Sequence, residues 1–136
     1  MVYFDTDVLI HTIIEQDFIK REISMNTLET CYNSKTLAIS LLSIQEIAFV
    51  LGKMKVSNDK ILEKLNFYMA LNPITLNIQH YERANFLATL MGFQNYNDCL
   101  HLALAESHCK ELYTFNKNDF NKIKNYTDLK INVLAI

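Results

Sequence analysis

The stretch "YFDTDVLIHTII", from Tyr3 to Ile14, decides how the fold is interpreted, because it places Asp5 and Asp7 within a largely apolar run. The three residues before Asp5 are typical of a short buried strand, and the residues through Ile14 favour a helix. Aspartate is a preferred N-cap residue, so either carboxylate can cap this helix. Capping explains one of the two aspartates and leaves the other for a different role.

Beyond this stretch, short apolar segments alternate with helical ones. We predict strands at residues 2–4, 37–40, 74–76, 112–115 and 131–136. Besides the helix through Ile14, we predict helices at residues 17–34, 41–52, 57–72, 80–92 and 96–109. Such alternation is typical of an α/β fold in which helices cover both faces of a parallel sheet. Open sheets of this kind bind ligands at the carboxyl ends of their strands, which is where Asp5 lies.

Length, composition and charge limit the function classes. The chain has 136 residues, 50% of them apolar, which is enough for one domain spanning residues 1–136 and too few for two. No segment approaches the ~18 apolar residues of a membrane span and no basic leader is present, so we expect a cytoplasmic protein. Three cysteines at irregular spacing favour reduced thiols. With a net charge of −2, a nucleic-acid partner would have to be held by local lysines or bound metal.

A further carboxylate, Glu46, lies within the apolar segment "SLLSIQEIAFVL". On a helical wheel it falls between Leu42 and Val50, so it faces packing rather than water. A lone carboxylate in that position is costly, which implies a metal ion or a basic partner. The alternative is a capping box between Ser43 and Glu46, although the helix can equally well begin at Ser40.

Two more polar positions lie close to predicted strand ends or helix starts. Asp98 opens an amphipathic helix, where N-capping is the ordinary explanation. Asn116 and Asp119 follow the predicted strand at residues 112–115, where a turn explains them equally well. Taken with Asp5, they put acids or an amide at the carboxyl ends of two strands and at nearby helix starts. Such a cluster must bind cations or become partly protonated, and hard divalent ions with oxygen ligands are the usual solution.

The order of these motifs resembles that of PIN-domain ribonucleases. "FDTDVLI", the glutamate of "SLLSIQEIAFVL", the aspartate of "NDCLHLALA" and "TFNKNDF" follow one another as they do in that family, from Asp5 to Asp119. The chain looks most like the VapC-type toxins of type II toxin-antitoxin pairs. The resemblance implies a three-layer, Rossmann-like parallel sheet and hydrolysis of RNA phosphodiester bonds assisted by Mg²⁺ or Mn²⁺. It also implies an antitoxin partner and a homodimer.

Carried over residue by residue, the family's first acid falls on Asp5, its helical glutamate on Glu46 and its third acid on Asp98. Relatives commonly have Asp where this chain has Asn116, and many have a further acid at the position of Asp119. The resemblance therefore implies that Asp5, Asp98 and either Asn116 or Asp119 hold the metal. Glu46 would bind the metal or orient the attacking water. Because Asn116 removes one negative charge, the resemblance also implies weaker binding of a second metal ion.

Five other side chains lie near these positions. The hydroxyls of Thr6 and Thr114 are suited to ordering water or phosphate. Three lysines just after the fourth predicted strand either contact RNA phosphates or form an ordinary solvated surface, namely Lys117, Lys122 and Lys124.

Some of the same residues also fit functions other than a nuclease. "DTDVL" also resembles the opening motif of haloacid-dehalogenase-type phosphatases, but no adjacent acidic pair follows the fourth predicted strand. A PIN-like binding module without nuclease activity is the other alternative, because Asn116 replaces an acid. A zinc site on the helix at residues 96–109 is disfavoured, because its cysteines and histidines do not converge at zinc-site spacing. These side chains, including His101, are interpreted as ordinary helix residues.

Overall fold

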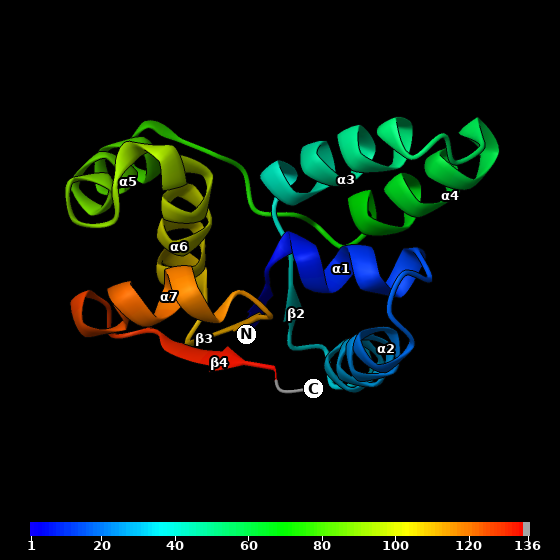
Figure 1. The fold of residues 1–136 in the computed structure, drawn as a ribbon, viewed down its shortest axis with the longest axis horizontal. Helices are drawn as coiled ribbons and strands as arrows, with labels where there is room; N and C mark the ends of the chain where they lie inside the picture. The colour runs from blue at the N-terminus through cyan, green and yellow to red at the C-terminus, as the bar shows by residue number, and fades with distance from the viewer. Residues whose placement is uncertain (135–136) are drawn as a thin grey trace.

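The computed structural model describes residues 1–134, and its strands form one parallel sheet in the order β2-β1-β3-β4 (Figure 1). The strands are β1 (Val2–Phe4), β2 (Leu37–Ala38), β3 (Glu111–Thr114) and β4 (Lys130–Val133). Because β1 pairs with both β2 and β3, Tyr3 lies opposite Ala38 on one side and Leu112 on the other. The predicted parallel α/β sheet is confirmed.

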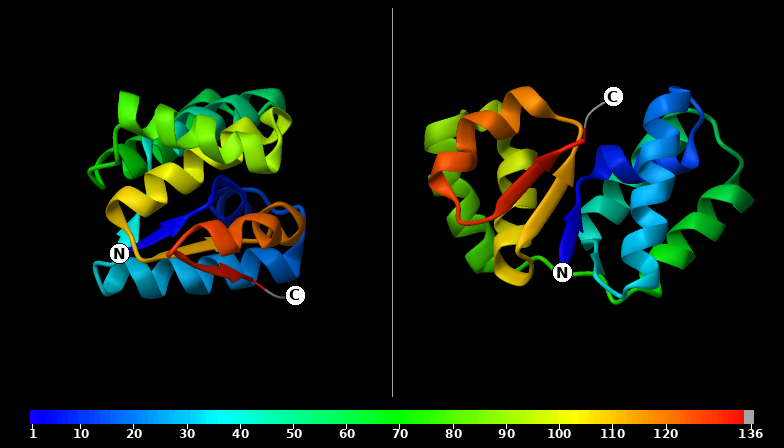
Figure 2. Two further views of the ribbon diagram at one scale, coloured as in Figure 1. Left: turned by 90° about the vertical axis from the view of Figure 1, so that its left-hand side faces the viewer. Right: turned by 90° about the horizontal axis from the view of Figure 1, so that it is seen from below.

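Helices cover both faces of this sheet, which makes three layers (Figure 2). One layer contains α1 (Thr6–Ile13), α2 (Phe18–Asn33), α3 (Leu41–Lys53) and α4 (Asn58–Met69). The other contains α5 (Ile78–Met91), α6 (Tyr96–His108) and α7 (Lys117–Ile123), with short 3₁₀ turns at Phe93–Asn95 and Lys124–Tyr126. No helix within residues 1–134 is long and apolar enough to cross a membrane.

The alternation of side chains along β1 divides the core into two clusters. Tyr3 packs with residues of α5, α6 and α7, whereas Val2 and Phe4 pack with residues of α1 to α4. Each cluster is apolar, but Tyr3 introduces a hydroxyl into the layer that contains α6. That hydroxyl needs a polar partner inside the protein.

Helix caps settle two alternatives that the sequence left open. Ser40 caps α3 by accepting a 3.1 Å hydrogen bond from the backbone N–H of Ser43, so the capping box between Ser43 and Glu46 is wrong. Asp98 lies in the first turn of α6 and is not its N-cap residue, so the capping explanation for Asp98 is also wrong. Both acids are therefore available for other contacts. Asp5, in contrast, does cap α1.

The predicted strand at residues 74–76 is wrong. Ile74 forms only an isolated bridge with Ser40, through bonds of 2.9 Å from its N–H to Ile39 and from Leu41 N–H to its carbonyl. Pro73 has no N–H to extend the pairing, and the cap of α5 follows at Asn77.

The C-terminal part of the chain differs from the sequence predictions in two further respects. The last predicted strand, residues 131–136, corresponds to β4, and its final two residues lie outside the described residues. A helix, α7, stands where the sequence indicated only a turn after β3.

Candidate active site at the carboxyl edge of the sheet

Asp5 lies where β1 ends and α1 begins, and it is only 6% exposed. Its Oδ1 accepts a 2.9 Å hydrogen bond from the backbone N–H of Thr6. Its Oδ2 accepts a 2.8 Å bond from the hydroxyl of Thr114, the last residue of the neighbouring strand β3. Asp5 therefore combines the capping role with a fixed position at the edge of the sheet.

Asp98 and Asp119 join Asp5 in a region of excess negative charge. Burial and then the charge of Asp5 raise the pKa of Asp98 to about 7, and Asp119 adds to the rise. Burial also raises the pKa of Asp5, despite the opposing effects of His101 and of its hydrogen bonds. In the described part of the chain, no lysine or arginine forms an ion pair with any of the three acids.

Asn116 contacts Asp119 at both ends of its amide. Its Oδ1 accepts a 3.3 Å hydrogen bond from the backbone N–H of Asp119 and so caps α7. Its Nδ2 donates a 2.8 Å bond to Asp119 Oδ2. Because the amide oxygen is engaged in the cap, Asn116 orients Asp119, and this arrangement favours Asp119 over Asn116 as a metal ligand.

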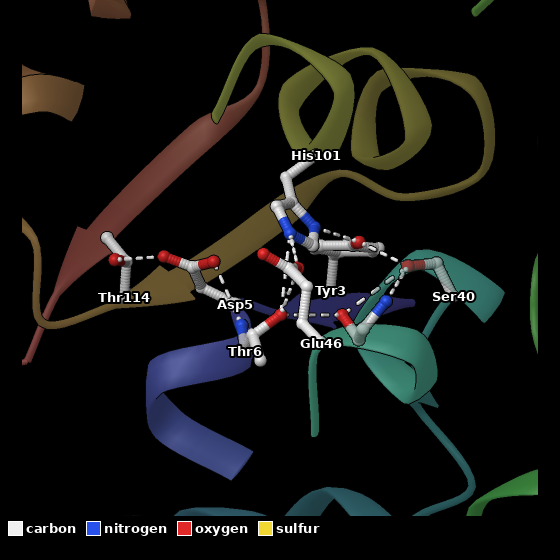
Figure 3. Close-up of polar contacts among 8 residues, drawn as sticks. Tyr3, Asp5, Thr6, Ser40, Glu46, His101 and Thr114 are labelled. Atoms are coloured by element: carbon white, nitrogen blue, oxygen red, sulfur yellow. Dashed lines mark hydrogen bonds and ion pairs between the residues drawn. The ribbon is translucent and has the colours of Figure 1, made fainter. Parts of the chain in front are cut away.

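Glu46 reaches the same edge from α3 and contacts α1 and α6 (Figure 3). Its Oε1 accepts a 2.8 Å hydrogen bond from the hydroxyl of Thr6 and also contacts Nε2 of His101. Burial favours a raised pKa for Glu46, but the hydrogen bond and charge of His101 outweigh it and lower the pKa. The basic partner that the sequence implied for a buried glutamate is thus a histidine of α6.

His101 is the residue of this region that sequence reasoning missed. Its side chain is almost fully buried, and although burial opposes the charged form, nearby Tyr3, Glu46 and Asp5 raise its pKa well above the ordinary value. The available signal was its spacing, because residues three apart share a helix face and His101 lies three positions after Asp98.

Asp7 points toward the chain segment that follows β3. Its Oδ2 accepts a 3.3 Å hydrogen bond from the backbone N–H of Phe115. Burial and then the charge of Asp5 raise its pKa to about 7. Its Oδ1 is buried and has no hydrogen-bond partner within residues 1–134. Asp7 does not cap α1, and instead it tethers the loop that leads to Asn116.

The structure thus brings the predicted site residues to one edge of the sheet. The charges of Asp5 and Asp119 both raise the pKa of Asp98, and Asn116 is bonded to Asp119. Glu46 is bonded to His101, and its charge raises the pKa of Asp5. Among the described residues, no three His, Cys, Asp or Glu side chains are already gathered into a metal site. The shared metal site therefore stays a prediction.

Comparisons with known proteins identify the family of the chain. The family model of the PIN domain matches residues 2–126. A toxin-antitoxin complex from Klebsiella pneumoniae contains a chain that is 25% identical, with a TM-score of 0.70 and 100% of both chains covered. VapBC2 from Rickettsia felis, bound to a DNA fragment from its promoter, contains a chain that is 20% identical, with a TM-score of 0.66, covering 97% of this chain and 98% of that one. No curated protein matches the sequence significantly. The chain belongs to the PIN domain family and, within it, is similar to VapC-like toxins.

Proposed function

We propose that this chain is a metal-dependent endoribonuclease that acts as the toxin of a toxin-antitoxin pair. The observation that carries the proposal is the group Asp5, Asp98 and Asp119, in which burial and mutual repulsion raise the pKa of Asp98 to about 7. A divalent cation would relieve this repulsion. Membership of the PIN domain family and the similarity to toxin-antitoxin chains support the same activity.

The donor set suits Mg²⁺ or Mn²⁺. Both ions accept carboxylate and carbonyl oxygens, and the described acids of this group lack a lysine or arginine partner. Asp5, Asp98 and Asp119 would hold the ion, while Asn116 orients Asp119. When bound, such an ion lowers the pKa of water and stabilises charge on a phosphate under attack.

The remaining roles fall to residues around this group. Glu46 would orient the attacking water through the oxygen that its protein partners do not use. Thr114 and Thr6 keep Asp5 and Glu46 in place through their hydrogen bonds. The three lysines after β3 are exposed and would contact RNA phosphates, namely Lys117, Lys122 and Lys124.

We also propose two protein partners. The similar chains of known structure come from complexes with antitoxins, which supports a cognate antitoxin for this chain. A homodimer would cover the apolar side chains that α5 and the following turn leave exposed, namely Ile78, Phe86, Leu90 and Phe93. Light scattering on the purified chain tests the dimer, and co-expression with the product of an adjacent small gene tests the antitoxin.

Cleavage of single-stranded RNA by the purified, antitoxin-free chain tests the proposed activity. We expect cleavage in millimolar Mn²⁺, weaker cleavage in Mg²⁺ and none in chelator. Asp5→Asn should abolish cleavage at every metal concentration, whereas the exposed Asp59→Asn control should cleave normally. RNA binding without cleavage under all conditions would instead identify a binding module. The phosphatase alternative lacks support, because Asp7 is bonded to the backbone of Phe115 and the chain has a PIN domain.

A further inference from the structure

A buried chain of hydrogen bonds runs from β1 to Glu46 (Figure 3). The hydroxyl of Tyr3 lies 2.7 Å from Oγ of Ser40 and 2.6 Å from Nδ1 of His101. The opposite ring nitrogen of His101, Nε2, bonds to Oε1 of Glu46. Tyr3, Ser40 and His101 are at most 1% exposed. The imidazole is thus held at both nitrogens and has no room to turn.

The two oxygens of Glu46 have different surroundings. Oε1 contacts both His101 and the hydroxyl of Thr6, whereas Oε2 has no hydrogen-bond partner within residues 1–134. The side chain of Glu46 is 27% exposed. In Figure 3 the carboxylate lies beside Asp5, whose pKa the charge of Glu46 raises. One oxygen therefore anchors the carboxylate and the other remains available at the site.

We infer that His101 is a positioning residue for the proposed nuclease reaction: it holds Oε1 of Glu46 so that Oε2 faces the reacting water. This inference rests on the proposed function. A glutamate side chain has three rotatable bonds, so a fixed anchor is needed to keep one oxygen in place. The anchor does not depend on the charge of the ring, because both the cation and the neutral ring with hydrogen on Nε2 donate to Glu46.

The 2.6 Å contact between Tyr3 and Nδ1 of His101 links the tyrosine hydroxyl to the protonation of the ring. When the Tyr3 hydroxyl donates to Nδ1, the hydrogen of the neutral ring must lie on Nε2, where it points at Glu46. Ser40 in turn accepts or donates at the same tyrosine oxygen. The cap residue of α3 and strand β1 thus act together on a carboxylate six residues further along that helix.

A double-mutant cycle separates positioning from a merely structural role. Glu46→Gln and His101→Leu should each lower the cleavage rate by ~10²-fold, and the double variant should lose no more than Glu46→Gln alone. His101→Gln, which keeps an N–H donor near the position of Nε2, should restore part of the loss. His108→Leu, at an exposed position of the same helix, should cleave like the parent. Losses that multiply in the double variant would overturn the inference.

A second measurement does not depend on activity or on the folding of His101→Leu. In NMR spectra of the parent, the hydrogen on Nε2 of His101 should give a downfield signal that exchanges slowly with water. Both Glu46→Gln and Tyr3→Phe should shift this signal, and Tyr3→Phe should lower cleavage less than Glu46→Gln does. A signal that neither variant shifts would overturn the inference. A parent that gives the signal but cleaves no RNA would overturn only the proposed function.

Discussion

The carboxylate of Asp5 accepts a 2.8 Å hydrogen bond from the hydroxyl of Thr114, although the two residues are 109 positions apart in the sequence. The contact exists because β1 and β3 are parallel neighbours, with Phe4 opposite Tyr113, so that both strands end at the same level. Thr114 also accepts a bond from the backbone N–H of Asn116. One buried hydroxyl thus connects two parts of the candidate site.

Thr114→Val should destabilise the protein, because it leaves a buried carboxylate oxygen and a backbone N–H without their partner. We expect a loss of about 1–3 kcal/mol in the free energy of unfolding, measured by urea denaturation. Thr114→Ser keeps the hydroxyl and should lose less. The exposed Thr75→Val serves as the control. Equal stability of the valine and serine variants would contradict a role for this hydrogen bond.

The stability of the metal-free protein should fall as the pH rises from about 4 to above 7. Burial and then the charge of Asp5 raise the pKa of Asp98 to about 7 in the folded chain, whereas an unfolded aspartate has a pKa of about 3.9. The folded state therefore binds more protons, so this stabilisation is complete below about pH 4 and is lost as the pH rises through about 7.

Asp98→Asn should flatten that pH dependence, since the amide does not titrate. With chelator present at pH 8, we expect the variant to unfold at the same or a higher temperature than the parent, with a gain of roughly 1–2 kcal/mol after allowing for solvent screening. Melting curves from pH 5.5 to 8 measure the difference. A variant with the same pH dependence as the parent would argue against the charge repulsion at Asp98.

Metal binding should stabilise the parent and not the Asp98→Asn variant. A ligand that binds only the folded state at 100 times its Kd adds about 2.7 kcal/mol, which is readily detected as a shift in Tm. We therefore expect Mn²⁺ to raise the Tm of the parent and of the exposed control Asp128→Asn, but to raise that of Asp98→Asn much less. Equal shifts in all three proteins would remove Asp98 from the set of ligands.

Asn116→Asp should reduce the Mn²⁺ concentration needed for half-maximal RNA cleavage. The substitution adds a negative charge next to Asp119 and keeps a side chain that caps helices well. Titration of the cleavage rate with Mn²⁺ measures the effect, with Asn118→Asp, an exposed position in the first turn of α7, as the comparison. A higher metal requirement would show that the hydrogen bond from the Asn116 amide to Asp119 matters more than the added charge.

Much of the fold follows from local patterns in the sequence. The helix predicted from residue 57 is α4, which Ser57 caps, and Gly92 ends α5 with a φ of 97°, a conformation that glycine adopts without strain. Asp5 could be placed at a strand end because the apolar strand and the following helix adjoin it directly. Capping, backbone conformation and periodicity depend on residues close in sequence, so these features need no knowledge of the rest of the molecule.

Other features of the fold and the site depend on contacts between segments that are far apart in the sequence. Ile74 makes one bridge and no strand, because Pro73 on one side has no N–H and the cap of α5 follows soon on the other side. His101 looked like an ordinary helix residue, yet it bonds to Glu46, 55 positions away. Periodicity shows that a side chain is buried but does not identify the side chain that it meets. Only the packing of α1, α3 and α6 around the end of β1 decided that a histidine, a threonine and a tyrosine would determine how Glu46 is held.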